Sequence, residues 1–125
     1  MFYMDYSNFS TGGYYDLTPH HDGISAVLTK KIISFENNDN ILLYGFSFGA
    51  RLAIDAGIES GLKGYEIDKI YACEPAGPGF FWYAKNSQKA AKYVECIHTS
   101  TDKGTAVYNC HRNWRFDSLS KLELN

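Results

Sequence analysis

Ser47 lies in a five-residue pattern that is typical of serines that attack ester carbonyl groups. The pattern is Gly45-Phe46-Ser47-Phe48-Gly49, and it stands between an apolar run and a helix-like segment. A nucleophile elbow requires this order of strand, sharp turn and helix. The two glycines lack a Cβ where the turn brings the backbone very close, and the amides at the start of the helix can stabilise a negative charge. The alternative is a glycine-rich turn in which the serine only caps the helix, but the order of the flanking elements favours the elbow.

Glu74 is the candidate acidic partner of Ser47. A serine hydroxyl is a weak nucleophile at neutral pH, so it needs a base, and the base needs a group that orients it. In sheets with this elbow the chain order is serine, then acid, then histidine, and Glu74 follows the next predicted strand. The prolines and glycines in the segment 74–79 predict an irregular turn. A rigid turn favours a carboxylate that is held in place over one that is simply solvated.

The sequence does not identify which of the four histidines would act as the base. His20 and His21 precede the elbow at the start of a predicted helix, where a capping or solvated role is expected. His98 and His111 follow the acidic residue and have the right chain order. His98 ends a predicted strand, where a hydrogen-bonded structural histidine is the commoner role. Both of these later histidines stay open as candidates.

The elements that position these residues alternate between strand and helix. Apolar runs predict strands at 2–6, 41–44, 67–73 and 93–98, and helical spacing of apolar residues predicts helices at 20–35 and 48–60. The other segments, at 7–19, 36–40, 61–66, 74–79 and beyond 99, are predicted to be turns and loops. This order predicts right-handed crossovers and a parallel sheet covered by helices. Working residues collect at the carboxyl ends of such strands, where Ser47, Glu74 and His98 are all expected.

The composition predicts a single globular domain and excludes several classes of function. The chain has 125 residues, of which 45% are hydrophobic and 16% aromatic, so a packed core is expected rather than disorder. The net charge is −2 without a run of like charges, so no nucleic-acid partner is predicted. No stretch approaches the ~20 apolar residues of a membrane span. The first residues lack the basic and apolar regions of a signal peptide.

Three cysteines give an odd count, which in a secreted domain leaves one thiol free or paired outside the chain. They are Cys73, Cys96 and Cys110. None of them forms a C-x-x-C pair, so no structural zinc site is expected, and no metal or cofactor is predicted.

Three segments together resemble the pancreatic-lipase-like family, in particular its insect members, which include A1-class phospholipases and catalytically inactive yolk proteins. The segments are Tyr44–Gly57, Cys73–Pro78 and Val94–Thr99. Met4-Asp5-Tyr6-Ser7 also resembles the family's valine-aspartate-tryptophan-serine strand. The resemblance implies an α/β-hydrolase fold, with a mostly parallel sheet and helices on both faces, and hydrolysis of a lipid ester without a cofactor. It places Ser47 as the nucleophile and Glu74 where the family has its aspartate.

The chain also departs from the family pattern. Phe46 replaces a usual histidine, and the extra methylene of Glu74 would shift a triad carboxylate by about one bond length, enough to cost ~100-fold in rate. The family's base normally lies further along the chain than the His98-Thr99 pair. We therefore expect a partial α/β-hydrolase domain over 2–116, truncated at both ends, an unassigned tail over 117–125, and no activity from this chain alone. The strands at 2–6 and 93–98 are then expected to be exposed edges.

Three functions are consistent with these observations. The leading expectation is a fragment of a secreted lipase or phospholipase that acts by acyl transfer on a triacylglycerol or phospholipid ester, in contact with a lipid interface. The second is a non-catalytic lipid-binding or storage protein on the same fold, like the yolk proteins, since fold does not fix function. The third is an intracellular serine hydrolase.

Overall fold

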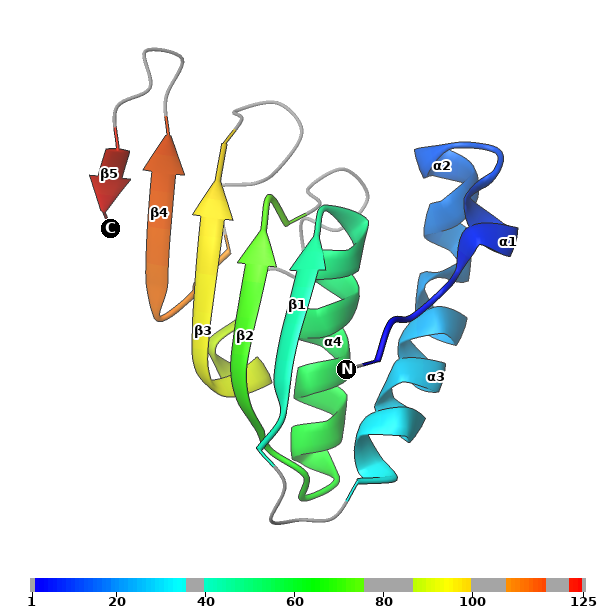
Figure 1. The fold of residues 1–125 in the computed structure, drawn as a ribbon, viewed down its shortest axis with the longest axis horizontal. Helices are drawn as coiled ribbons and strands as arrows, with labels where there is room; N and C mark the ends of the chain where they lie inside the picture. Colours follow the sequence, from blue (N-terminus) through cyan, green and yellow to red (C-terminus); the bar gives the residue numbers. More distant parts are fainter. Residues whose placement is uncertain (1, 36–39, 76–86, 100–107, 117–121, 125) are drawn as a thin grey trace.

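A mostly parallel five-stranded sheet forms the centre of the fold in the computed structural model (Figure 1). The structure describes residues 2–35, 40–75, 87–99, 108–116 and 122–124. The strand order is β1-β2-β3-β4-β5, in which the first four strands are parallel and the last pair is antiparallel. The predicted α/β class with a mostly parallel sheet is therefore confirmed.

The observed elements match the predicted ones through the middle of the chain. The strands are β1 (Leu42–Phe46), β2 (Ile67–Cys73), β3 (Ala91–His98), β4 (Arg112–Phe116) and β5 (Leu122–Leu124). The helices are α1 (Ser7–Ser10), α2 (Tyr14–Leu17), the 3-10 turn η1 (Thr18–His20), α3 (His21–Ile33) and α4 (Phe48–Leu62). The predictions for β1, β2, β3, α3 and α4 are confirmed to within a few residues. The predicted turns at 36–40 and 74–79 lie largely outside the described residues.

α4 packs on one face of the sheet through small and apolar side chains. Ile54 of α4 and Ile70 of β2 are fully buried in the main core, and each such side chain stabilises the fold by about 1.5–3 kcal/mol. Gly57 allows this close approach, because a Cβ there would lie 2.3 Å from the carbonyl oxygen of Ala90. α4 can therefore lie against β1, β2 and the turn that precedes β3.

α3 packs on α4 rather than on the sheet. Ile24 of α3 joins a second buried cluster with Leu17, Phe48 and Leu52, and Ile32 joins the main core. Val27 lies on the other side of α3 and is 61% exposed. The helical spacing of apolar residues predicted the buried side of α3 but not the exposure of Val27.

The predicted strand at 2–6 is wrong. These residues form no strand, and Phe2 and Tyr3 are 70% and 87% exposed. Met4 and Tyr6 instead pack against the second cluster, where the Tyr6 and Phe48 rings lie 5.7 Å apart. Aromatic side chains can be buried against a helix as well as in a sheet, so an aromatic run alone does not predict strand pairing. The predicted loop at 7–19 likewise contains the short helices α1 and α2.

The prediction that the chain is loop-like beyond Thr99 is also wrong, because β4 and β5 lie there. β4 mixes charged and aromatic residues and so has no apolar alternation. Its strand conformation depends on pairing with β3, in which Glu95 lies opposite Arg112 and the indole of Trp114 donates a hydrogen bond to the Glu95 carboxylate at 2.6 Å. β5 pairs with β4 and lies in the segment that the sequence assigned to no element.

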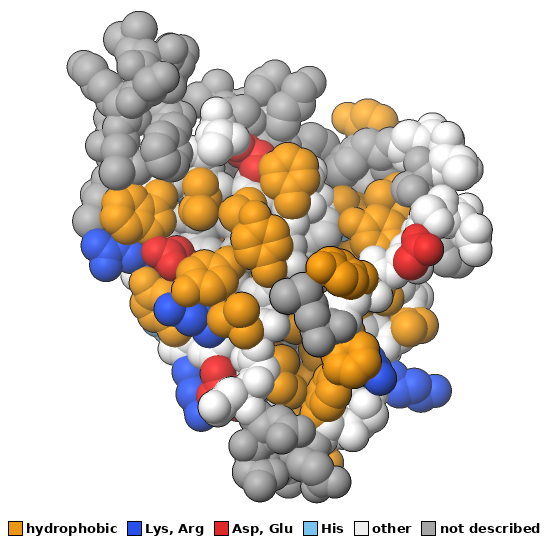
Figure 2. All heavy atoms as spheres, viewed as in Figure 1, with side chains coloured by type: hydrophobic (Ala, Val, Ile, Leu, Met, Phe, Trp, Pro, Cys, Tyr) orange, Lys and Arg blue, Asp and Glu red, His pale blue; other side chains and the backbone are white. Residues whose placement is uncertain are grey.

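The expectation of helices on both faces is wrong for the described residues. α4 contacts β1, β2 and β3 from one side, and in the described part of the chain no helix covers the other side (Figure 1). We call this other side the outer face; it includes Leu42, Tyr44 and Phe46, which are 58%, 70% and 65% exposed. Figure 2 shows hydrophobic side chains gathered over this face. Among the described strands, the edges of the sheet are β1 and β5, so the expected edges at 2–6 and 93–98 are also wrong.

Candidate functional site

Ser47 has a strained backbone at the junction of β1 and α4. Its φ of 54° and ψ of −115° lie in a region that side chains rarely adopt, at a cost of about 1–3 kcal/mol. Gly45 makes the turn possible, because a Cβ there would lie 2.3 Å from the carbonyl oxygen of Gly49. This is the sharp strand-to-helix turn that the G-x-S-x-G pattern predicted.

The hydroxyl of Ser47 does not cap α4. The carbonyl oxygen of Ser47 accepts hydrogen bonds from the amides of Ala50 and Arg51 at 3.1 and 3.2 Å, but its side chain forms no capping hydrogen bond. Ser47 is half-buried and stands at the N-cap position of a 15-residue helix, next to the first amides of α4 in the chain. Such amides have no intrahelical partner and can stabilise an oxyanion. The interpretation of Ser47 as a simple capping residue is therefore not supported.

Glu74 is a buried carboxylate, and within the described residues only one of its two oxygens accepts hydrogen bonds. It follows β2, has a φ of 50° and is 6% exposed. Its Oε2 accepts hydrogen bonds from the Thr99 amide at 2.6 Å and from the Thr99 hydroxyl. Its Oε1 is buried and has no hydrogen-bond partner among the described residues. An unsatisfied buried acceptor costs about 1–3 kcal/mol, so this oxygen is ready to accept an N–H donor.

The register of the sheet brings three candidate site residues together at the carboxyl ends of the strands. Phe46 pairs with Cys73, and Cys73 pairs with Ile97. Ser47, Glu74 and His98 each stand next after these three residues in the chain. Since neighbouring strands lie about 4.8 Å apart, Ser47 and Glu74 occupy adjacent positions at the carboxyl edge of the sheet.

His98 is a buried, neutral histidine. It is 4% exposed, and its Nε2 lies 3.0 Å from the amide oxygen of Asn113, so Nε2 donates this hydrogen bond. Nδ1 is buried, and no residue in the described part of the chain forms a hydrogen bond with it. Burial is the largest effect on the pKa of His98 and lowers it, aided by the charge of Arg115 and opposed by Asn113 and Glu74. The arrangement is that of a hydrogen-bonded strand histidine, the role expected from its position.

His111 lies away from Ser47. His111 precedes β4, accepts a hydrogen bond from the Val94 amide at 2.9 Å and stacks on Tyr93. It stands four residues before Arg115, the partner of His98, so it lies about 13 Å toward the amino end of the sheet. His20 is exposed at the end of η1. No described residue forms a hydrogen bond with the Ser47 hydroxyl.

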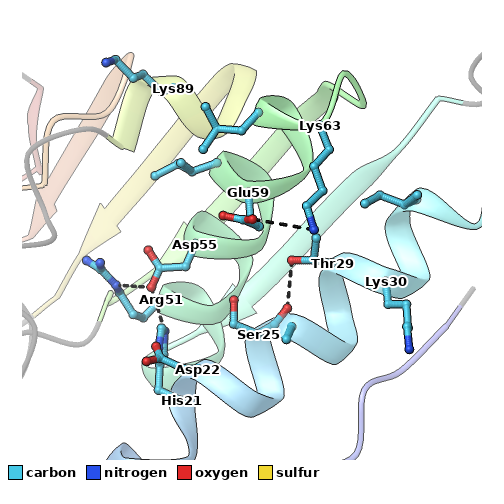
Figure 3. A pocket seen from close by; sticks show the side chains of 14 residues that line it. His21, Asp22, Ser25, Thr29, Lys30, Arg51, Asp55, Glu59, Lys63 and Lys89 are labelled. Carbon is cyan, nitrogen blue, oxygen red and sulfur yellow. Dashed lines mark hydrogen bonds and ion pairs between the residues drawn. The ribbon is translucent and has the colours of Figure 1, made fainter.

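A second group of charged side chains lines a surface pocket of about 870 Å³ between α3 and α4 (Figure 3). His21 Nε2 lies 2.7 Å from Asp55 Oδ2, and the same oxygen accepts a hydrogen bond from Arg51 Nε at 2.7 Å. Arg51 is 1% exposed and also donates to the Tyr108 hydroxyl at 3.2 Å. The expectation that His21 is solvated or capping is therefore wrong. The i,i+4 spacing of Arg51 and Asp55 could have indicated part of this cluster.

Opposing effects set the pKa of His21. Burial acts to lower it, but the hydrogen bonds with Asp55 and Asp22 outweigh burial, and the net pKa is raised. In the described part of the chain, no group of histidine, cysteine and acidic side chains is arranged to hold a metal ion. Across the same residues, no helix has the length and apolar character needed to cross a membrane.

Cys96 and Cys110 form a disulfide that joins β3 to the segment before β4. Cys73 is a free, partly exposed thiol on the outer face, and it donates a hydrogen bond to the Tyr44 hydroxyl at 3.4 Å. Cys73 is thus the thiol without a disulfide partner that the odd number of cysteines predicted.

No protein-family model matches this chain, and no curated protein matches it either.

Proposed function

We propose that this chain contributes the nucleophile and the acid of a serine-dependent lipid ester hydrolase on an α/β-hydrolase fold. The strained backbone of Ser47 is the main support for this proposal. Ser47 has a rare backbone conformation, and its hydroxyl forms no capping hydrogen bond with α4. The buried Glu74 at the next strand end adds to this support. The choice of a lipid ester as substrate follows from the resemblance to the pancreatic-lipase-like family.

In the proposed reaction, the Ser47 oxygen attacks the ester carbonyl carbon while a histidine takes its proton. The amides at the start of α4 stabilise the oxyanion, and the tetrahedral intermediate expels the alcohol, which takes the proton from the histidine. Water then hydrolyses the acyl-enzyme by the same steps. Glu74 Oε1 would accept the histidine N–H, while Thr99 holds Oε2 in place.

The proposed base is a histidine of a longer parent protein. His98 already donates its Nε2–H to Asn113, and His111 lies toward the amino end of the sheet. In the pancreatic-lipase-like family the base lies further along the chain than the His98-Thr99 pair. The isolated chain would then have the nucleophile and the acid but no proton acceptor, and we expect no ester hydrolysis from it.

A fluorophosphonate probe tests this function, since it labels activated serines. We expect the parent protein to be labelled at Ser47. Ser47→Ala should abolish labelling, and Glu74→Gln should slow it by about 100-fold or more, because an amide cannot orient the base as a carboxylate does. Ser34→Ala, which removes an exposed hydroxyl at the end of α3, is the matched control and should label normally. Labelling of the parent protein that is no stronger than that of Ser47→Ala would contradict the proposal.

The second candidate is a non-catalytic lipid-binding or storage protein on the same fold. One observation favours it: within the described residues, no histidine forms a hydrogen bond with the Ser47 hydroxyl. An unlabelled parent protein that retains a lipid through purification would support this candidate.

A further inference from the structure

β1 forms one edge of the sheet, and half of its backbone groups point away from β2. The Ile41 carbonyl oxygen accepts from the Asp68 amide at 3.1 Å, and the Ser47 amide donates to the Cys73 carbonyl at 2.8 Å, so odd-numbered residues face β2. Since this direction alternates along a strand, Leu42, Tyr44 and Phe46 direct their N–H and C=O groups to the open edge. In the described part of the chain, no strand pairs with that side of β1.

The same three residues place their side chains on the outer face. Leu42, Tyr44 and Phe46 are 58%, 70% and 65% exposed, so an apolar stripe runs along the open edge. Natural sheets usually protect an edge strand with lysine, proline, an inward-pointing charge or a bulge. β1 has the sequence LLYGF, which contains no charged residue and no proline.

We propose that β1 pairs with β1 of a second copy of this chain, antiparallel and centred on Tyr44. This register places Tyr44 opposite Tyr44 of the partner subunit, and Leu42 opposite Phe46 of the partner subunit. Every one of these positions directs its backbone groups to the edge, so each facing pair exchanges two N–H···O=C bonds. Aromatic and apolar side chains then meet across the junction on the outer face, which stabilises cross-strand pairs.

The open backbone groups favour a polypeptide over a lipid surface as the occupant, because acyl chains offer no hydrogen-bonding partners. A second copy suits this edge because the stripe is self-complementary about Tyr44. A fully buried aromatic side chain covers about 150–250 Å², so these three residues offer roughly 300–400 Å² per copy. That is below the ~800 Å² per partner of a standard interface, so we expect a weak dimer with a Kd of about 1–100 μM.

Sedimentation velocity over a concentration series of the 125-residue chain tests the dimer. We expect the wild type to move from monomer to dimer. Tyr44→Lys should raise the Kd by at least about tenfold, because it places two ammonium groups directly opposite each other. Val27→Lys makes the same change in charge at a 61% exposed position on α3 and should leave the Kd unchanged. Circular dichroism checks that each variant is folded.

Cysteine cross-linking tests the register. In a Cys73→Ser background, Leu42→Cys and Phe46→Cys proteins should form a disulfide when mixed, because facing α-carbons in such pairs lie about 5.5 Å apart. Neither protein should cross-link alone, since like positions lie about 13 Å apart along the strands. Cross-links in each protein alone would indicate parallel pairing and overturn the register. A chain that stays monomeric throughout the series, or that binds phosphatidylcholine vesicles through Tyr44 instead, would overturn the proposal.

Discussion

At the scale of single residues, Ser47 has a φ of 54°, a backbone conformation that is strained for residues other than glycine. Replacing Ser47 by glycine should relieve this strain, because glycine adopts positive φ without a steric cost. We expect Ser47→Gly to be more stable than Ser47→Ala by about 1 kcal/mol, which raises the midpoint of thermal unfolding by roughly 3–5 °C.

Ser34 provides the control for this strain, since it has an ordinary helical φ of −70°. There the order should reverse, with Ser34→Ala more stable than Ser34→Gly. If Ser47→Gly proved no more stable than Ser47→Ala, Ser47 would not be strained in solution.

The site residues could be predicted only as far as local sequence determines them. Ser47 and Glu74 follow apolar runs whose register in a parallel sheet could be anticipated, and the structure places them side by side. The hydrogen bond from the Thr99 amide to Glu74 joins residues that are 25 positions apart in the sequence. The hydrogen bond from Arg51 to Tyr108 joins residues that are 57 positions apart. Contacts of this kind depend on which strand neighbours which, and no local pattern encodes them.

At the scale of the elements, His21 ties α3 to α4 through Asp55. The raised pKa of His21 means that the folded state binds its proton more tightly than the unfolded chain does. The stabilisation is therefore complete below the ordinary value of about 6.5, and it is lost as the pH rises through the raised pKa. Because Asp55 is partly exposed, we expect a contribution of at most about 1 kcal/mol.

Urea unfolding at about pH 5.5 and pH 8.5 measures this contribution. His98 acts in the opposite direction, because its lowered pKa makes the folded state resist protonation. The comparison therefore needs His21→Asn, in which the His98 effect is retained. We expect the variant to lose more stability than the wild type does on going to the lower pH. Equal pH dependence in the two proteins would show that the His21–Asp55 contact contributes nothing.

The success of the element predictions follows the strength of local periodicity. α3, α4 and the first three strands have clear apolar patterns, and all were found. β4 has no such pattern, since Arg112, Asn113 and Arg115 alternate poorly with Trp114, and its conformation comes from pairing with β3. The run at 2–6 has the composition of a strand, but Met4 and Tyr6 pack against the second cluster while Phe2 and Tyr3 stay exposed.

At the scale of the whole molecule, the Cys96–Cys110 disulfide joins the centre of the sheet to its second half. The two residues are 14 apart in sequence, and a loop of that length is expected to stabilise the fold by about 3 kcal/mol. Reduction, or the double change Cys96→Ala and Cys110→Ala, should lower the free energy of unfolding by about that amount in urea titrations. Cys73→Ala is the control and should change it little. A reduced protein as stable as the oxidised one would contradict this role.

The register of the sheet also limits how this chain can tolerate changes in length. The position of Glu74 depends on the register of β2 with β1 and β3. One residue added or removed within β2 would shift Glu74 by about 3.3 Å and turn its side chain to the opposite face of the sheet. The turn at 63–66 lies outside the ladder and can absorb such a change. Insertions and deletions among related sequences are therefore expected in that turn, while the number of residues from Ile67 to Glu74 stays fixed.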